Sequence, residues 1–332
     1  LIYVLIMNII SLIIAKFNSW YIGIPAQILT YIAYSIWYVQ GIFSPGSIIN
    51  QSSYPVLTTF FFLLVYYALF TVLSFIQSSD NKEKEAIGLT VINTVALAGF
   101  GLGVINQYYP ELNGLYLMLV AALTLIVGVL AKNFKFENVF DISFVSTLSL
   151  VAIAIPVQFD KTIVTVLWSL MALGLAFAGL QIGNKRLLYV GYIGYLIPLF
   201  RVFFMDLWVL DGIERWLAVG ACLAGLITLQ ILVMKKYTSE AVRKDALFKI
   251  YSSIGLVLGA IWAAREVTDL NISFGSQQVI LSIIWALYSV ALITYGVVKR
   301  VKLFTWAGII IFGIVLVKVL IIDDDAVNSR VV

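Results

Sequence analysis

The sequence predicts an all-α integral membrane protein with about 12 transmembrane helices, built from repeated antiparallel helix hairpins. Three observations lead to this fold class: an apolar composition, a series of long apolar runs, and a concentration of cations in alternate joints between the runs. Of the 332 residues, 62% are hydrophobic and 11% are charged, and the mean hydropathy is +1.03. A soluble domain is about half apolar and about a quarter charged, so we expect lipid to cover much of the surface.

Each expected helix is an apolar run long enough to cross a bilayer. A spanning helix needs about 20 mainly apolar residues, because lipid offers the backbone no hydrogen-bond partners. Such runs occupy approximately residues 1–16, 20–40, 55–76, 86–107, 112–131, 139–158, 162–182, 187–206, 212–234, 247–264, 277–298 and 303–322. Most joints are short, so consecutive helices should be antiparallel. We expect one polytopic membrane domain over residues 1–332 and, because the chain starts inside an apolar run, a longer parent chain.

The charge of the joints predicts the orientation. Loops after the odd-numbered helices hold 15 of the 21 Lys and Arg residues, and the opposite side holds six. Acidic residues show the reverse bias, with ten of 17 on the cation-poor side. Because loops rich in Lys and Arg stay on the cytoplasmic side of a membrane, the odd-numbered loops are expected to be cytoplasmic.

An internal repeat is visible when the chain is shifted by 117 residues. Residues 168–206 then align with 285–323 without a gap, and eleven of the 39 pairs are identical. The informative pairs are Trp168 with Trp285, Gly179 with Gly296, Lys185 with Lys302, Gly191 with Gly308, and Asp206 with Asp323. The shift covers four helices, so the copies should have the same orientation and form a parallel repeat. We predict that hairpins 162–206 and 279–323 are two copies of one unit.

Each copy ends with a cation followed five residues later by an aspartate: Arg201 and Asp206, then Lys318 and Asp323. In an α-helix this step separates the side chains by about 140° and about 7.5 Å of rise, so an intrahelical ion pair is a poor fit. Either the cations snorkel to the interface, or they face the bundle and neutralise an anionic group. We expect snorkelling for Lys318 and a partner contact for Arg201.

The candidate anion or ion-pair site comprises Arg201, Asp206, Asp211, Arg215, Lys318 and Asp323. Carboxylates on this side could also hold a divalent cation, although exposed helix-end carboxylates are the preferred interpretation. The absence of histidine removes the commonest general base, and a single cysteine, Cys222, excludes a disulfide framework. We therefore predict no catalytic residue, metal or cofactor. For Asn8, Asn93 and Gln230, polar residues inside expected spans, interhelical hydrogen bonds are expected.

A family resemblance is carried by three segments, of which the early stretch "FNSWYIGIPAQILTYIAYSIWY" (17–38) looks like a Trp-flanked helix of that family. The stretch "AIPVQFD" (154–160) with the following "VTVLW" resembles the bacterial predicted membrane proteins called domain of unknown function 2339. The stretch "FRVFFMDLWVLDGIERWLAVG" (200–220) is similar to the same family's cation, Asp, Asp-Gly and Arg pattern, carried here by Arg201, Asp206, Asp211, Gly212 and Arg215. The last copy departs from it, because Lys318 replaces the arginine and no Asp-Gly-x-x-Arg follows. The resemblance implies a multi-pass protein of the bacterial inner membrane.

Three functions remain open from the sequence. The first is a structural or interaction component of the cell envelope, with membrane lipids and another membrane or envelope protein as partners and no nucleic acid. The second is a transporter or lipid-handling protein that uses the interface between repeated hairpins. The third is an envelope enzyme acting on a lipid-linked substrate.

Overall fold

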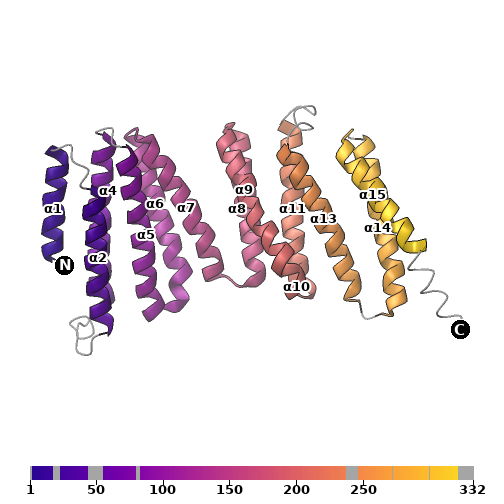
Figure 1. The fold of residues 1–332 in the computed structure, drawn as a ribbon, viewed down its shortest axis with the longest axis horizontal. Coiled ribbons are helices and arrows are strands. Elements are labelled where there is room, and N and C mark those ends of the chain that lie inside the picture. Colours follow the sequence, from indigo (N-terminus) through magenta and orange to yellow (C-terminus); the bar gives the residue numbers. More distant parts are fainter. Residues whose placement is uncertain are drawn as a thin grey trace. The chain divides into compact units, whose positions relative to one another are not determined.

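The structure of the chain is a computed structural model. It describes residues 2–17, 23–43, 55–79, 83–236, 246–270, 272–298 and 300–320. Within these ranges every regular element is a helix (Figure 1). The all-α prediction is therefore confirmed for the described part of the chain.

The chain divides into two compact units, Leu1–Phe159 and Asp160–Val332. The first unit contains α1 (Ile2–Phe17), α2 (Gly23–Phe43), α4 (Pro55–Ser79), α5 (Glu83–Tyr108), the short 3₁₀-helix η1 (Pro110–Leu112), α6 (Asn113–Asn133) and α7 (Glu137–Gln158). The second contains α8 (Lys161–Ile182), α9 (Lys185–Arg201), the π-helix η2 (Val202–Asp206), α10 (Leu207–Val209), α11 (Gly212–Lys236), α13 (Ala246–Thr268), α14 (Phe274–Val298) and α15 (Lys302–Lys318).

The helices coincide with the predicted apolar runs to within a few residues, and α9, η2 and α10 together cover one run. In the described ranges, nine helices are long and apolar enough to cross a membrane. Because their apolar side chains are exposed along most of their length, lipid is the solvent that fits this surface. The protein is accordingly an all-α, multi-pass membrane protein.

Polar side chains join the helices of the first unit. Asn93 on α5 accepts a hydrogen bond from the Tyr31 hydroxyl at 2.6 Å and donates to the Tyr67 carbonyl at 2.8 Å, so α2, α4 and α5 meet at one amide. Thr30 donates to Asn8 Oδ1 at 2.8 Å and connects α2 to α1. In lipid, such groups have no water to bond, and the hydrogen bonding expected for Asn8 and Asn93 is present.

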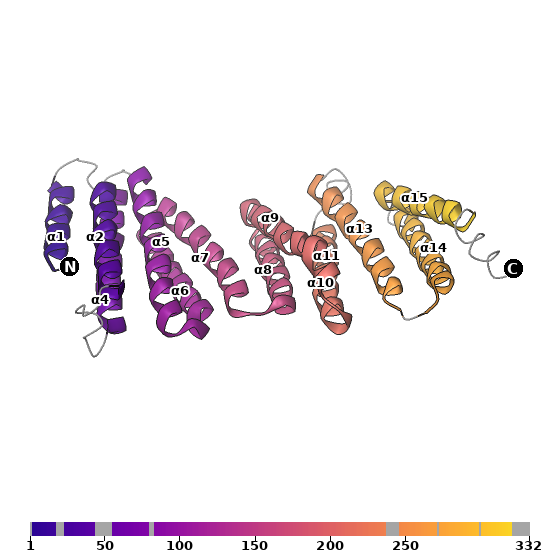
Figure 2. The ribbon, with the colours of Figure 1, turned by 60° about the horizontal axis from the view of Figure 1, so that its bottom comes forward.

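The hairpin of α8 and α9 positions Arg201, and small residues allow its close packing. A Cβ built on Gly179 would overlap the backbone of Leu188, and one on Gly191 would overlap the backbone of Ala176. Gly183 ends α8 with φ +76°, a left-handed conformation that suits glycine at the end of a helix. The two helices lie side by side in both views (Figures 1 and 2).

The hairpin of α14 and α15 packs through the corresponding positions. A Cβ on Gly296 would overlap the backbone of Thr305, and one on Gly308 would overlap that of Ile293. Arg300 occupies the turn with φ +55°. Each of these residues follows its counterpart in α8 and α9 by 117 positions, including Arg300 and Gly183 in the two left-handed turns.

Candidate functional site

Arg201 and Asp206 form an ion pair within one helical segment, with 3.3 Å between Nε and Oδ1. The expectation that this spacing disfavours such a pair was wrong, because Val202–Asp206 is a π-helix. Hydrogen bonds in a π-helix run between residues five apart, so the side chain at position i+5 returns to the face occupied by position i. The widened turn therefore brings the guanidinium and the carboxylate together.

Helix α8 completes the surroundings of this pair. Arg201 Nη2 donates to the Lys161 carbonyl at 2.8 Å, and the Thr165 hydroxyl donates to Asp206 Oδ2. The guanidinium also lies 5.9 Å from the centroid of the Trp168 ring, within the range of a cation–π interaction. The Asp206 side chain is only 3% exposed and that of Arg201 16%. Both charges are thus neutralised inside the hairpin.

Lys318 makes equivalent contacts in the second hairpin. Its Nζ donates to the Gln278 carbonyl at 2.9 Å and to the Ser282 hydroxyl at 2.6 Å. The expected snorkelling of this amine is corrected: the half-buried Lys318 bonds to α14. Gln278 and Ser282 follow Lys161 and Thr165 by 117 residues. Asp323, the predicted partner in this copy, lies outside the described residues.

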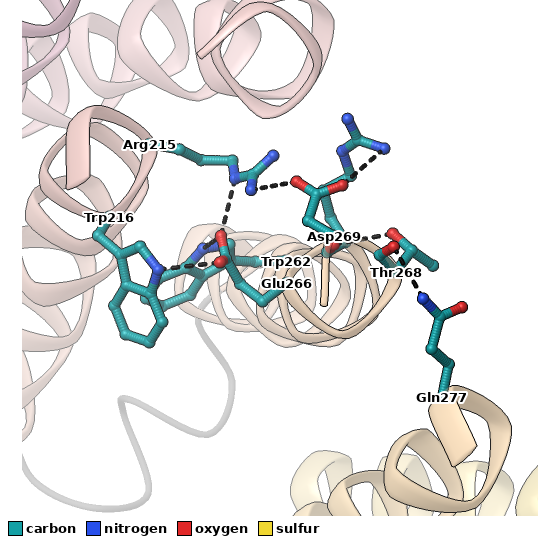
Figure 3. Close-up of polar contacts among 8 residues, drawn as sticks. Arg215, Trp216, Trp262, Glu266, Thr268, Asp269 and Gln277 are labelled. Atoms are coloured by element: carbon teal, nitrogen blue, oxygen red, sulfur yellow. Dashed lines mark hydrogen bonds and ion pairs between the residues drawn. The ribbon is translucent and has the colours of Figure 1, made fainter. Parts of the chain in front are cut away.

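Arg215 lies at the start of α11 and is buried, with its side chain 1% exposed. Its Nε donates to Glu266 Oε1 at 2.7 Å and its Nη2 to Asp269 Oδ2 at 2.5 Å. Glu266 belongs to α13, and Asp269 follows directly after it. Figure 3 shows the guanidinium between these two carboxylates. One arginine thereby joins the ends of two helices with two charge-assisted hydrogen bonds.

Two tryptophans hold the Glu266 carboxylate. Trp216 Nε1 donates to Oε2 at 2.9 Å, and Trp262 Nε1 donates to Oε1 at 3.0 Å. The two rings meet edge to face with centroids 4.8 Å apart (Figure 3). Arg265 Nη1 lies 3.3 Å from Asp269 Oδ1 and adds a second cation. We call Arg215, Trp216, Trp262, Arg265, Glu266 and Asp269 the Arg215 cluster.

Glu266 and Asp269 were missed by sequence reasoning. A signal for them exists, because Trp262, Glu266 and Asp269 are spaced by four and three residues, which places them on one face of a helix. That face lies at the same end of the unit as Arg215. The spacing does not identify the neighbouring helix that this face contacts.

Asp211 is not brought to either arginine. Its side chain and that of Glu214 are exposed, and the Asp211 carbonyl accepts the Glu214 backbone N–H at 3.2 Å in the first turn of α11. Asp206, by contrast, is buried against Arg201. The carboxylates considered for a divalent cation thus lie in different environments, and the residues that the structure describes contain no group of three or more His, Cys, Asp or Glu arranged to hold a metal.

Comparisons with protein-family models, curated proteins and solved structures gave no significant match to this chain. The proposed function therefore rests on the geometry of the Arg201–Asp206 ion pair and of the Arg215 cluster.

Proposed function

We propose that this chain is a structural or interaction component of the bacterial cell envelope that resides in the inner membrane and acts without catalysis. The observation that carries the proposal is that the charged side chains within the helix bundle bond to one another and to neighbouring helices. Arg215 is bonded to Glu266 and Asp269, and Arg201 to Asp206 and α8. These five groups join helices. Arg201 also lines an open pocket of about 470 Å³, but the rest of that lining is apolar or aromatic and holds no second charged side chain that would bind a polar substrate. A rigid scaffold needs such internal connections.

The proposed topology has twelve spans with the odd-numbered loops in the cytoplasm. The positions of the helices support the number of spans, and the 15-to-6 distribution of cations supports the orientation. Membership of the domain of unknown function 2339 family belongs to the same proposal, on the strength of the segments around 154–160 and 200–220.

The hairpins 162–206 and 279–323 are proposed to be copies of one unit. Their support is a set of contacts that recur with the same offset: two glycine positions against the facing helix, a left-handed residue in the turn, and a cation bonded to a carbonyl of the preceding helix. In the second copy Val319 and Leu320 are also π-helical, at the positions that follow the cation as η2 follows Arg201.

The role in the envelope is tested by deletion and complementation in the source bacterium. Loss of the chain should lower the resistance of the cells to osmotic shock, and the wild-type gene should restore it. Arg215→Met should fail to restore resistance, whereas Arg265→Met should restore it, since Arg265 is partly exposed and only supplements the cluster. Deletion cells that resist osmotic shock as the parent cells do would contradict a structural role.

A further inference from the structure

A pocket of about 310 Å³ lies between α11, α13, α14 and α15 in the second unit. Its lining is mainly aliphatic and aromatic, with Leu226, Phe248, Tyr288, Tyr295 and Phe304 among the contributing residues. The volume reaches the lower end of the range of small-molecule sites, about 300–1,000 Å³. An acyl chain is an apolar group that suits a lining of this kind.

Two polar side chains face this apolar space. Gln230 and Ser252 line the pocket and are 8% and 6% exposed. The amide Nε2 and Oε1 of Gln230 and the hydroxyl of Ser252 have no hydrogen-bond partner among the described residues, so the interhelical bond expected for Gln230 is not formed. Buried polar groups are nearly always bonded. A complementary ligand therefore carries oxygen acceptors next to its apolar part.

The depth of these groups matches a phospholipid. Gln230 lies six residues before the end of α11 and Ser252 six residues after the start of α13, which is about 9 Å from each helix end. The exposed Ile227 and Ile231 also line the pocket, so a lipid chain can enter it from the side. A glycerol ester at this depth leaves its phosphate near the helix ends.

The helix ends above the pocket are cationic. The ends of α11 and α14 and the starts of α13 and α15 lie together at one end of the unit (Figure 1). Exposed cations at these ends are Lys235, Lys236, Lys249, Arg300 and Lys302. Basic groups of this kind attract anionic lipid head groups, with each Lys or Arg adding to the attraction.

We propose that this pocket binds an anionic glycerophospholipid, with one acyl chain in the apolar space, an ester carbonyl accepting hydrogen bonds from Gln230 Nε2 and Ser252 Oγ, and the phosphate at the cationic helix ends. The site adds a lipid ligand to the structural role and does not depend on a protein partner.

The polar contact is tested with Gln230→Leu in purified full-length chain. Phosphatidylglycerol is added to the protein in detergent, and its binding is measured by native mass spectrometry and by the shift in thermal unfolding. Loss of one hydrogen bond should weaken binding about fivefold to tenfold. The lipid-free variant should be at least as stable as wild type, because the change removes unbonded polar atoms. Unchanged phosphatidylglycerol binding, or a lipid-free variant less stable than wild type, would overturn the proposal.

The charge contact is tested by comparing phosphatidylglycerol with phosphatidylcholine of the same acyl chains. Wild type should prefer phosphatidylglycerol, and Lys235→Gln combined with Lys302→Gln should reduce the preference, since three of the five cations remain. Lys185→Gln combined with Arg186→Gln is the matched control, since these cations are exposed in the first turn of α9, in the other hairpin. Equal loss in both double variants, or no preference in wild type, would show that the pocket has no selective anionic site.

Discussion

The Nε of Arg201 lies 3.3 Å from the carboxylate of Asp206, five residues later in the same helical segment. A regular α-helix would place the two side chains on different faces, and the π-helix η2 places them on one. The same carboxylate accepts a hydrogen bond from Thr165. The π-helical hydrogen bonding of the backbone therefore lets Arg201 and Asp206 pair with each other. Both side chains also bond to α8, Arg201 through the Lys161 carbonyl and Asp206 through Thr165.

Arg201→Lys should destabilise the protein even though it keeps the charge. The arginine contacts Asp206 through Nε and the Lys161 carbonyl through Nη2, whereas one ammonium cannot take both positions. Loss of one charged hydrogen bond should lower the free energy of unfolding by about 1.5–3 kcal/mol, measured by denaturant titration in detergent. Arg186→Lys, at an exposed position in the first turn of α9, is the control. If both variants unfold as wild type does, the contacts of Arg201 do not stabilise the packing of α9 against α8.

Arg215→Met should lower the free energy of unfolding by more than Arg201→Lys does. It leaves Glu266 and Asp269 without their shared partner, and removal of one member of a buried ion pair costs about 3–5 kcal/mol. Because Glu266 and Asp269 are 21% and 33% exposed, we expect the lower end, about 3 kcal/mol.

The matched control for this prediction is Arg265→Met on α13. Arg265 is 31% exposed and pairs with Asp269 from the same helix, so its loss should cost under about 1 kcal/mol. The unfolding of both variants is followed by tryptophan fluorescence, for which Trp216 and Trp262 are reporters inside the cluster. An equal loss of unfolding free energy in the two variants would contradict the claim that Arg215 is the main cation of the cluster.

The glycine contacts give a test of the repeat. Gly191→Ala and Gly308→Ala each introduce a methyl group against the backbone of the facing helix, and both should lower the thermal unfolding temperature to a similar extent. Gly174→Ala is the control, because nothing lies within 4 Å of the added carbon. There the substitution should stabilise α8 by about 0.5–1 kcal/mol. A tolerated alanine at 308 beside a damaging one at 191 would argue against two copies of one hairpin.

Topology is tested by thiol labelling in a Cys222→Ala background. Cysteines introduced singly at Glu240 and Ser47 are treated with an impermeant reagent on intact cells. The cation distribution predicts that position 47 is labelled from outside and position 240 only after the cells are opened. The opposite pattern would reverse the proposed orientation.

Apolar runs were sufficient to locate the helices. The run expected at 162–182 is α8, Lys161–Ile182, because length and hydropathy decide where a chain can be helical in lipid. The π-helix at Val202–Asp206 could not be foreseen, since it depends on which carbonyl each backbone N–H selects after Pro198. The sequence predicted a partner contact for Arg201 but disfavoured Asp206 as the partner, and the π-helix makes Asp206 that partner.

The Arg215 cluster was foreseen only in part. The sequence placed Arg215 in the candidate ion-pair site, but placed Asp211, which is exposed, in the same site. Its actual partners are Glu266 and Asp269, more than 50 residues away in sequence. Such a pairing depends on which helices are neighbours, and apolar periodicity carries little information about that.

The claim of an interaction component is tested most directly by the mass of the intact particle. The tagged chain is extracted into discs of native membrane, and the mass of the purified particle is measured together with its protein and lipid composition. The proposed role predicts a complex of fixed stoichiometry with a second membrane or envelope protein, retained in Arg265→Met and lost in Arg215→Met. A particle that contains this chain and lipid alone would contradict it.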